Sequence, residues 1–204
     1  SPPSIAGCQI FPADNFWNTS IAGYPLHPKS TDYINNIGGA THLHPDFGDG
    51  YRENGELESA YGISYVVVSN DPDKYENNDK IYKKSDIPVS FLWWDESDCQ
   101  ITGSASEKLC SDDIPPSYPS PAERISEVSD DVAEISKIIE SGSDSHLVSI
   151  DADTCQLYEV QHYSYTVDGN SITDVTGDSG AIWDLSKSEQ RDNNITSADA
   201  AGLA

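Results

Sequence analysis

The stretch that decides the fold spans residues 143–185 and reads SDSHLVSIDADTCQLYEVQHYSYTVDGNSITDVTGDSGAIWDL. It predicts adjacent β-strands at residues 146–150, 155–165 and 180–185, because these runs are rich in apolar, aromatic and β-branched residues. Turn residues separate the runs, as in the DADT sequence before Cys155 and the Asp168-Gly169 pair. A β-sheet is therefore expected at the centre of the fold.

Further strands are predicted on the N-terminal side of this stretch, at residues 62–68 and 87–94. The first of these has apolar residues on both faces, which indicates a central position in the sheet. We expect a single mainly β domain over residues 1–204, built as a β-sandwich or jelly-roll-like pair of sheets. A doubly wound nucleotide-binding fold is disfavoured, because helices do not alternate with strands along the chain.

Two helices are predicted in addition to the strands. Residues 121–139 have apolar residues at three-and-four spacing after Ser120, a suitable N-cap, and should pack on the sheet as an amphipathic helix. A short helix is predicted at residues 29–37, with Ser30 as its N-cap and Gly38 at its end.

The charge of the chain excludes two classes of partner. The sequence has 35 acidic and 11 basic residues, for a net charge of −24, and would repel nucleic acid and anionic membranes. No apolar run approaches the ~20 residues that a membrane-spanning helix needs. The sequence begins at Ser1 without a charged and apolar leader, so we expect a secreted protein in its mature form.

The four cysteines predict two disulfides formed in an oxidising compartment. Cys99 and Cys110 bracket a short polar loop and are the expected local pair, which leaves Cys8 to bond Cys155. Thiolate metal binding is the alternative, although no C-x-x-C spacing supports it. Asn18 and Asn194 begin N-glycosylation sequons, which apply if the source is eukaryotic.

Carboxylates and imidazoles that are able to move protons near neutral pH form the candidate catalytic set. Its members are His44, Asp46, Asp95, Glu96, Asp144 and His146. The alternative for the histidines is a structural role in the turns, and for Asp95 and Glu96 it is a solvated acidic turn.

Aromatic residues form the candidate substrate-binding set, which consists of Trp94, Tyr158 and Tyr163. Trp93 and Trp94 are expected on a strand, where adjacent side chains face opposite ways, so that one indole packs in the core and the other is exposed. An exposed indole beside carboxylates provides a stacking surface for a sugar together with acids for proton transfer. Packing in the sheet is the alternative role of the tyrosines.

Two metal sites are considered. His42 and His44 lie on one face of a predicted strand, a spacing that suits Zn²⁺ or Cu²⁺ with Asp46 or His146 as a third ligand. Ca²⁺ is the cofactor suggested by a loop rich in carboxylates, although this loop lacks the regular spacing of an EF-hand. The oxygen ligands there would come from Asp71, Asp73 and Asp79.

Seven segments, found in the same order along nearly the whole chain, carry a resemblance to one protein family. They are residues 16–18 (FWN), 44–48 (HPDFG), 95–98 (DESD), 141–146 (SGSDSH), 155–159 (CQLYE), 179–185 (SGAIWDL) and 196–203 (TSADAAGL). These segments resemble a family of secreted bacterial and fungal β-rich proteins that often occur beside immunoglobulin-like or carbohydrate-binding modules. The family has no assigned reaction, so the resemblance implies extracellular polysaccharide work by association only. The disulfide loop and much of the predicted long helix depart from the family pattern as insertions, and the family continues beyond the last of these segments.

The expected function is that of a secreted carbohydrate-active protein, a polysaccharide-degrading hydrolase or lyase that uses carboxylate and histidine acid–base chemistry. The alternative is a non-catalytic extracellular protein that binds glycan or assembles with itself. A neutral polysaccharide is the better substrate, since a polyanionic one would need a basic cleft or bridging calcium in a chain of net charge −24. Residues 196–204 are expected to pack against the body or a neighbouring chain, which predicts a homo-oligomer or a second chain that completes the fold; an ordinary disordered terminus is the alternative.

Overall fold

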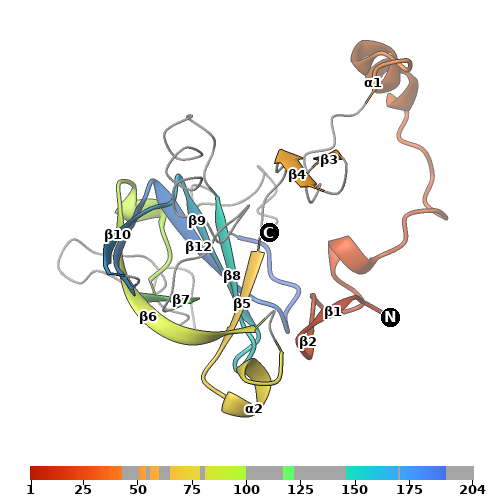
Figure 1. The fold of residues 1–204 in the computed structure, drawn as a ribbon. Helices are drawn as coiled ribbons and strands as arrows, with labels where there is room; N and C mark the ends of the chain where they lie inside the picture. Colours follow the sequence, from red (N-terminus) through yellow and green to blue (C-terminus); the bar gives the residue numbers. More distant parts are fainter. Residues whose placement is uncertain are drawn as a thin grey trace.

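Eight strands form one mixed sheet that curls strongly, as the computed structural model shows (Figure 1). The structure describes residues 1–42, 51–53, 56–59, 65–78, 81–99, 117–121, 146–169 and 171–191. The strand order is β10-β11-β6-β5-β8-β9-β12, and β7 pairs with β6 off this path. The strands of this sheet are β5 (Tyr65–Ser69), β6 (Ile81–Phe91), β7 (Ser117–Pro121), β8 (Leu147–Asp151), β9 (Gln156–Gln161), β10 (Ser164–Asp168), β11 (Ser171–Gly177) and β12 (Ser179–Asp184).

Smaller elements lie outside this sheet. Two short hairpins are formed by β1 (Ser4–Ile5) with β2 (Cys8–Gln9) and by β3 (Tyr51–Glu53) with β4 (Glu56–Ser59). Among the described residues, the helical elements are η1 (Phe16–Asn18), α1 (Ser30–Ile37), α2 (Pro72–Tyr75) and η2 (Trp94–Glu96). The prediction of a mainly β fold is confirmed, and β8 to β12 come from the stretch at residues 143–185.

The single strand predicted at residues 155–165 is in fact two strands. Cys155 (φ 55°) is a turn residue before β9, and His162 (φ 50°) breaks the strand before β10 begins. Both residues have the left-handed backbone conformation, which cannot continue a β-ladder. This break places His162 at a corner of the sheet.

β5 lies in the middle of the sheet and runs parallel to both of its neighbours, β6 and β8. Its side chains are buried on both faces, as predicted for residues 62–68: Val67 belongs to one core cluster and Val66 to the other. The first cluster packs beneath the β1–β2 hairpin and contains Phe11, Trp183 and Leu185. The second cluster contains side chains from strands between β5 and β12. This part of the core therefore forms where the single sheet curls around its own side chains.

β12 is the last strand of the sheet, and its edge away from β9 is covered by the segment that follows β6. The backbone N–H of Asp98 donates to the carbonyl of Gly180 at 3.0 Å, and its carboxylate accepts from the N–H of Ile182 at 2.9 Å. Ser97 Oγ accepts from the N–H of Gly180 at 3.1 Å. A Cβ at Gly180 would lie 2.3 Å from the Phe91 ring, so this close approach requires glycine. Covering this edge prevents the unpaired strand from recruiting another chain.

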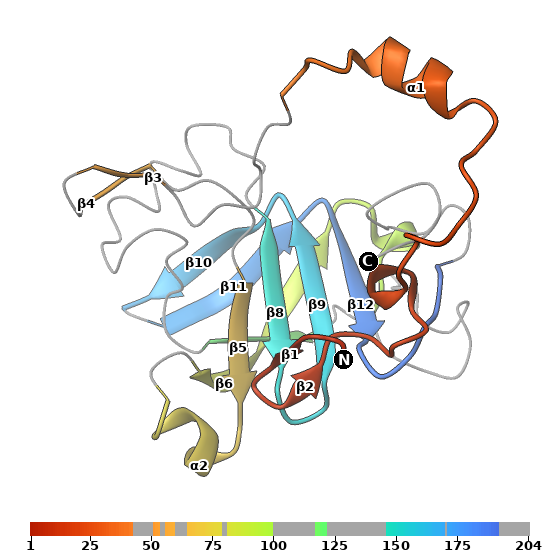
Figure 2. The same cartoon turned by 90° about the vertical axis from the view of Figure 1, so that its right-hand side faces the viewer.

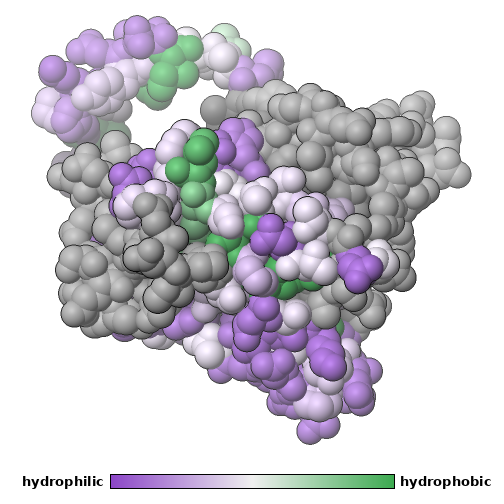
Figure 3. All heavy atoms as spheres, turned by 90° about the vertical axis from the view of Figure 1, so that its left-hand side faces the viewer, coloured by the Kyte–Doolittle hydropathy of each residue, from purple (hydrophilic) through white to green (hydrophobic). Residues whose placement is uncertain are grey.

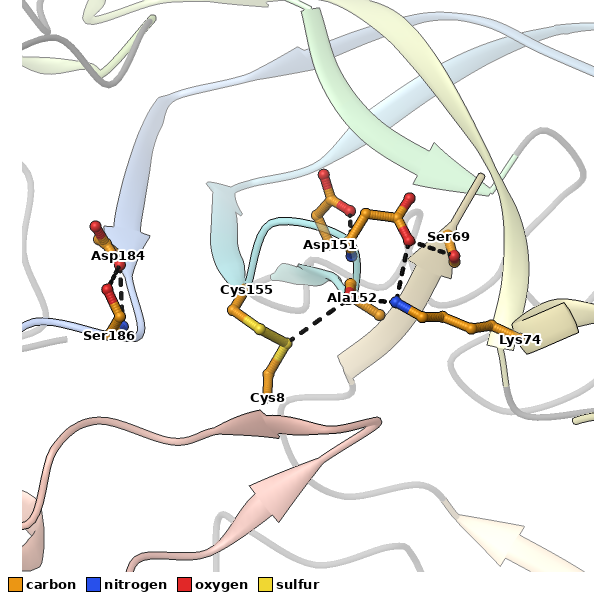
Figure 4. Close-up of a disulfide and its surroundings, with 9 residues drawn as sticks. Cys8, Ser69, Lys74, Asp151, Ala152, Cys155, Asp184 and Ser186 are labelled. Atoms are coloured by element: carbon orange, nitrogen blue, oxygen red, sulfur yellow. Dashed lines mark hydrogen bonds and ion pairs between the residues drawn. A yellow bond between two sulfur atoms is a disulfide. The ribbon is translucent and has the colours of Figure 1, made fainter. Parts of the chain in front are cut away.

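The predicted disulfide between Cys8 and Cys155 is confirmed and ties the β1–β2 hairpin to the sheet (Figure 4). Cys99 is also disulfide-bonded, and its predicted partner, Cys110, lies outside the described residues. Such bonds are compatible with an oxidising compartment. Within the part of the chain that the structure describes, no helix is long and apolar enough to cross a membrane.

The short predicted helix is α1, but its cap differs from the prediction. Ser30 is the first helical residue, and the N-cap is Lys29, whose side chain makes no capping hydrogen bond. Gly38 (φ 90°) ends the helix, as predicted. The helix stands away from the sheet in two views (Figures 1 and 2), and its apolar residues Tyr33 and Ile34 are more than half exposed. Figure 3 shows such apolar side chains in green on this projecting segment.

The predicted start of the long helix is wrong. Ser120 and Pro121, predicted as its N-cap and first residue, belong to β7, where they pair with Ser85 and Lys84 of β6. Residues 122–139 lie outside the described residues.

A polar network joins the end of β5 to the turn between β8 and β9 (Figure 4). The carboxylate of Asp153 accepts hydrogen bonds from Ser69 Oγ at 2.6 Å and from the backbone N–H of Asn70 at 2.7 Å. Lys74 Nζ lies 3.2 Å from the same carboxylate and donates to the carbonyl of Ala152 at 2.8 Å. Burial alone would raise the pKa of Asp153, but these hydrogen bonds and the charge of Lys74 lower it to about 2.

Protonation of Asp153 should therefore contribute to acid unfolding. The folded-state pKa is lower than the unfolded one, so the carboxylate stabilises the protein above about pH 4, and this contribution is lost as the pH falls from about 4 to about 2. Replacing Asp153 with Asn should lower the free energy of unfolding at pH 7 by about 1 kcal/mol, a figure that allows for solvent screening. Urea unfolding measured between pH 2 and pH 7 checks this, with Asp174→Asn as a control. Parallel pH curves for the wild type and Asp153→Asn would contradict it.

Candidate functional site

Two adjacent indoles lie on a tight turn at the end of β6, which we call the aromatic turn (residues 92–96). The N–H groups of Leu92 and Trp93 donate to the carbonyls of Gly177 (2.9 Å) and Asp178 (2.7 Å), and the chain then turns into η2. The predicted strand at 87–94 therefore begins earlier and ends at Phe91. Since Trp93 and Trp94 lie on a turn, both are exposed, by 43% and 39%, and the expectation that one would be buried is wrong.

The aromatic turn is held at its far end as well. Ser97 is fully buried, and its Oγ donates to the carbonyl of Trp93 at 2.6 Å while it accepts from the N–H of Gly180. The N–H of Ser97 donates to the carbonyl of Trp94 at 3.2 Å. The backbone that carries the two indoles is thus fixed to β11 and β12, which reduces the entropy that a ligand would have to remove.

An imidazole–carboxylate pair lies directly beside this turn. Asp178 connects β11 to β12; its N–H donates to the carbonyl of Gln161 at 2.9 Å, and its own carbonyl accepts from Trp93. Its carboxylate is hydrogen-bonded to Nδ1 of His162, a side chain that is half exposed. The pair was missed in the sequence analysis. The stop in apolar alternation at Gln161-His162 marks a break in the predicted strand, but nothing in the sequence links His162 to Asp178.

His146, a predicted catalytic residue, lies at the same end of the sheet. Leu147 is opposite Val160 in the β8–β9 ladder, so His146 lies one residue further along, at the end where β9 runs into His162. The Nε2 atom of His146 is 3.8 Å from Oε2 of Glu159. Glu159, which is not a member of the predicted catalytic set, is therefore a carboxylate partner of His146.

Burial raises the pKa of Glu159, although the charge of Arg191 and a side-chain interaction with Trp183 act in the opposite direction. Arg191 lies 5.0 Å above the Trp183 ring and forms a buried ion pair with Asp98. The charged side chains of Glu159, Arg191 and Asp98 therefore connect the candidate site to the covered edge of β12. The raised pKa favours the protonated form of Glu159, which is the form that donates protons.

The other predicted catalytic residues divide into two groups. Asp95 and Glu96 lie on η2 directly after Trp94, and Asp95 is exposed. His44, Asp46 and Asp144 lie outside the described residues. Asp95 and Glu96 therefore lie on the turn that bonds Asp178, and His146 lies at the same end of the sheet, directly before β8.

The predicted substrate-binding tyrosines pack against the second core cluster. Tyr158 is edge-on to the Tyr118 ring at 5.1 Å, its hydroxyl donates to Gln156, and its pKa is raised to about 12 by burial and by the charges of Asp151 and Asp86. Tyr163 lies 5.5 Å from the Tyr165 ring. These contacts are those of packing residues, which was the alternative role considered for them.

The predicted metal and glycosylation residues have local roles where the structure describes them. Asp71 is the N-cap of α2 and accepts from the N–H of Asp73, and Asp79 lies outside the described residues. Among the described residues there is no group of three or more His, Cys, Asp or Glu that could hold a metal ion. The Nδ2 atom of Asn18 donates to the carbonyl of Ile10 at 2.8 Å, and Asn194 lies outside the described residues.

Comparisons with protein-family models, curated proteins and solved structures found no match to this chain.

Proposed function

We propose that this protein is a secreted carbohydrate-active protein that binds a neutral polysaccharide through the indoles of the aromatic turn. The observation that carries the proposal is the exposure of both Trp93 and Trp94 on a turn whose backbone is fixed at both ends. Such indoles are ready to stack on the C–H faces of sugar rings. The Cys8–Cys155 disulfide supports secretion, because such bonds persist in oxidising compartments.

The charge of the protein supports a neutral polymer. A net charge of −24 repels polyanionic chains, whereas a neutral glycan makes its contacts through stacking and hydrogen bonds. Asp95 and Glu96 follow the second indole and provide acceptors for sugar hydroxyls. The aromatic turn thus combines stacking surfaces and hydrogen-bond acceptors in five consecutive residues.

In the first form of this proposal, the protein cleaves the polysaccharide as a hydrolase or a lyase. It is supported by the imidazoles of His146 and His162 and by the raised pKa of Glu159, all at one end of the sheet. The second form is a non-catalytic module, and the exposed apolar residues of α1 favour a self-assembling protein of this kind. Measuring new reducing ends and the absorbance of unsaturated products separates the two forms.

Replacing Trp94 with Ala should weaken binding to neutral polysaccharide roughly 5–30-fold, because about 1–2 kcal/mol of stacking is lost. Affinity electrophoresis in gels that contain xylan, glucomannan or β-glucan measures this change. Trp17→Ala is the matched control, since Trp17 is a similarly exposed indole (62%) on the N-terminal segment. Equal retardation of Trp94→Ala and the wild type in every gel that slows the protein would contradict the proposal.

A further inference from the structure

We propose that His162 and Asp178 form an acid–base pair that hydrolyses acyl esters on the polysaccharide bound at the aromatic turn. This inference rests on the proposed function, because it takes the indoles as the surface that brings the substrate to the pair. It gives that substrate a chemical class: a neutral glycan whose hydroxyls carry acyl groups such as acetyl.

In this pair, the carboxylate of Asp178 orients the His162 ring so that the ring can act as a base. Asp178 accepts at Nδ1 of His162, which places the ring proton there and leaves the lone pair on Nε2. The His162 side chain is half exposed, so a substrate can approach the ring. A carboxylate that orients an imidazole in this way also stabilises the imidazolium formed during catalysis.

The backbone of the pair is fixed on both sides. Asp178 donates its N–H to Gln161 and accepts from Trp93, so one residue connects the strand before His162 to the aromatic turn. His162 itself is in the left-handed conformation (φ 50°), and the β9 ladder ends at the residue before it. These bonds hold the imidazole and the indole of Trp93 on neighbouring segments.

Ester hydrolysis is the reaction that a single oriented imidazole can complete. Nε2 removes a proton from water as the water oxygen attacks the acyl carbon to form a tetrahedral intermediate. The intermediate then collapses: the C–O bond to the sugar breaks, and the imidazolium returns its proton to the departing sugar oxygen. The products are the free carboxylic acid and the sugar hydroxyl, so one imidazole acts first as base and then as acid.

Water is the nucleophile in this scheme. Ser179 follows Asp178 in the chain, but it is 2% exposed and its Oγ donates to Gln161 at 3.3 Å. A glycosidic bond would need a second, protonated carboxyl group beside the base. Asp178 is engaged with His162, Asp95 on the adjoining turn is exposed, and Glu159 is paired with His146, so an ester is the better substrate for this pair.

The test uses acetylated xylan and acetylated glucomannan as substrates, with 4-nitrophenyl acetate as a small probe. The wild-type chain should release acetate from at least one of the acetylated glycans. His162→Asn should lower this rate by at least about 100-fold, the usual contribution of a general base. Asparagine is chosen because it tolerates the left-handed backbone, so the corner keeps its shape. The matched control is His27→Gln, an exposed histidine on the N-terminal segment, whose rate should equal that of the wild type.

A further variant tests Asp178 as the positioning residue. Asp178→Asn should lower the maximal rate by at least about tenfold while binding of the deacetylated glycan stays unchanged. A purely structural role would instead change binding or the thermal unfolding midpoint together with the rate.

The outcomes separate this inference from the proposed function. Binding of glycan without release of acetate, or equal rates for the wild type and His162→Asn, overturns the acid–base pair and leaves the binding function intact. A third outcome is that the protein binds no glycan and hydrolyses only 4-nitrophenyl acetate, in a reaction that depends on His162. This outcome supports the acid–base pair and overturns the proposal that the ligand is a polysaccharide. Absence of both activities overturns both.

Discussion

Replacing Asp98 with Ala should lower the free energy of unfolding by about 3–5 kcal/mol, because it leaves the buried guanidinium of Arg191 without its charged partner. Asp98 is 1% exposed, and its carboxylate also accepts from the N–H of Ile182 in β12. The substitution therefore removes an ion pair and a bond to the covered edge at once. Urea unfolding with an unchanged m-value would measure this loss.

Two further variants make the test specific. Asp95→Ala removes an exposed carboxylate from the same turn and should change stability by less than about 0.5 kcal/mol. In the double variant Asp98→Ala/Arg191→Met, neither charge is left unpaired, so the loss should be smaller than the sum of the two single losses. A loss below about 1 kcal/mol for Asp98→Ala would show that the Arg191 pair does not hold this edge.

The sheet could be predicted from sequence because its local signals agree. The β-branched and aromatic runs and their turns predicted β8, β12 and the run that forms β9 and β10, whereas β11 was not named as a strand. Equal apolar character on both faces predicted the central place of β5. The Cys8–Cys155 pairing followed from cysteine spacing alone. The break at His162 was missed, because a left-handed residue inside an aromatic run depends on the sheet corner and not on local propensity.

The candidate site was predictable in part. The Trp-Trp-Asp-Glu sequence drew attention to the aromatic turn, but its shape depends on backbone bonds from Leu92 and Trp93 to residues 177 and 178, far along the chain. The pair of His162 and Asp178 likewise joins two corners that are separated by β10 and β11. Glu159 appeared in the sequence as an ordinary strand residue, and only its burial raises its pKa, against the opposing effects of Arg191 and Trp183. Long-range placement of this kind has no signature in a single sequence.

Removing the Cys8–Cys155 bond should have the largest effect on stability of any change considered for this chain. The bond joins residues that are 147 apart in sequence, and the chain-entropy model gives a stabilisation of about 5 kcal/mol for a loop of that length. The hairpin that it anchors has only two residues in each strand, which is too little pairing to hold the segment in place. Cys8, which is 1% exposed, and Phe11 bring this hairpin onto the core under Trp183 and Leu185.

The variant Cys8→Ala/Cys155→Ala should therefore unfold at a much lower urea concentration, and its first twenty residues should become sensitive to limited proteolysis under native conditions. Cys99→Ala/Cys110→Ala is the matched comparison: it also removes two cysteines, but the shorter predicted loop should cost only about 3 kcal/mol and leave the N-terminal segment protected. Equal losses in the two variants would show that loop length does not set the effect. A protected N-terminus in the first variant would show that packing of Phe11 alone holds the hairpin, since the covalent constraint would then be redundant with burial of this cluster.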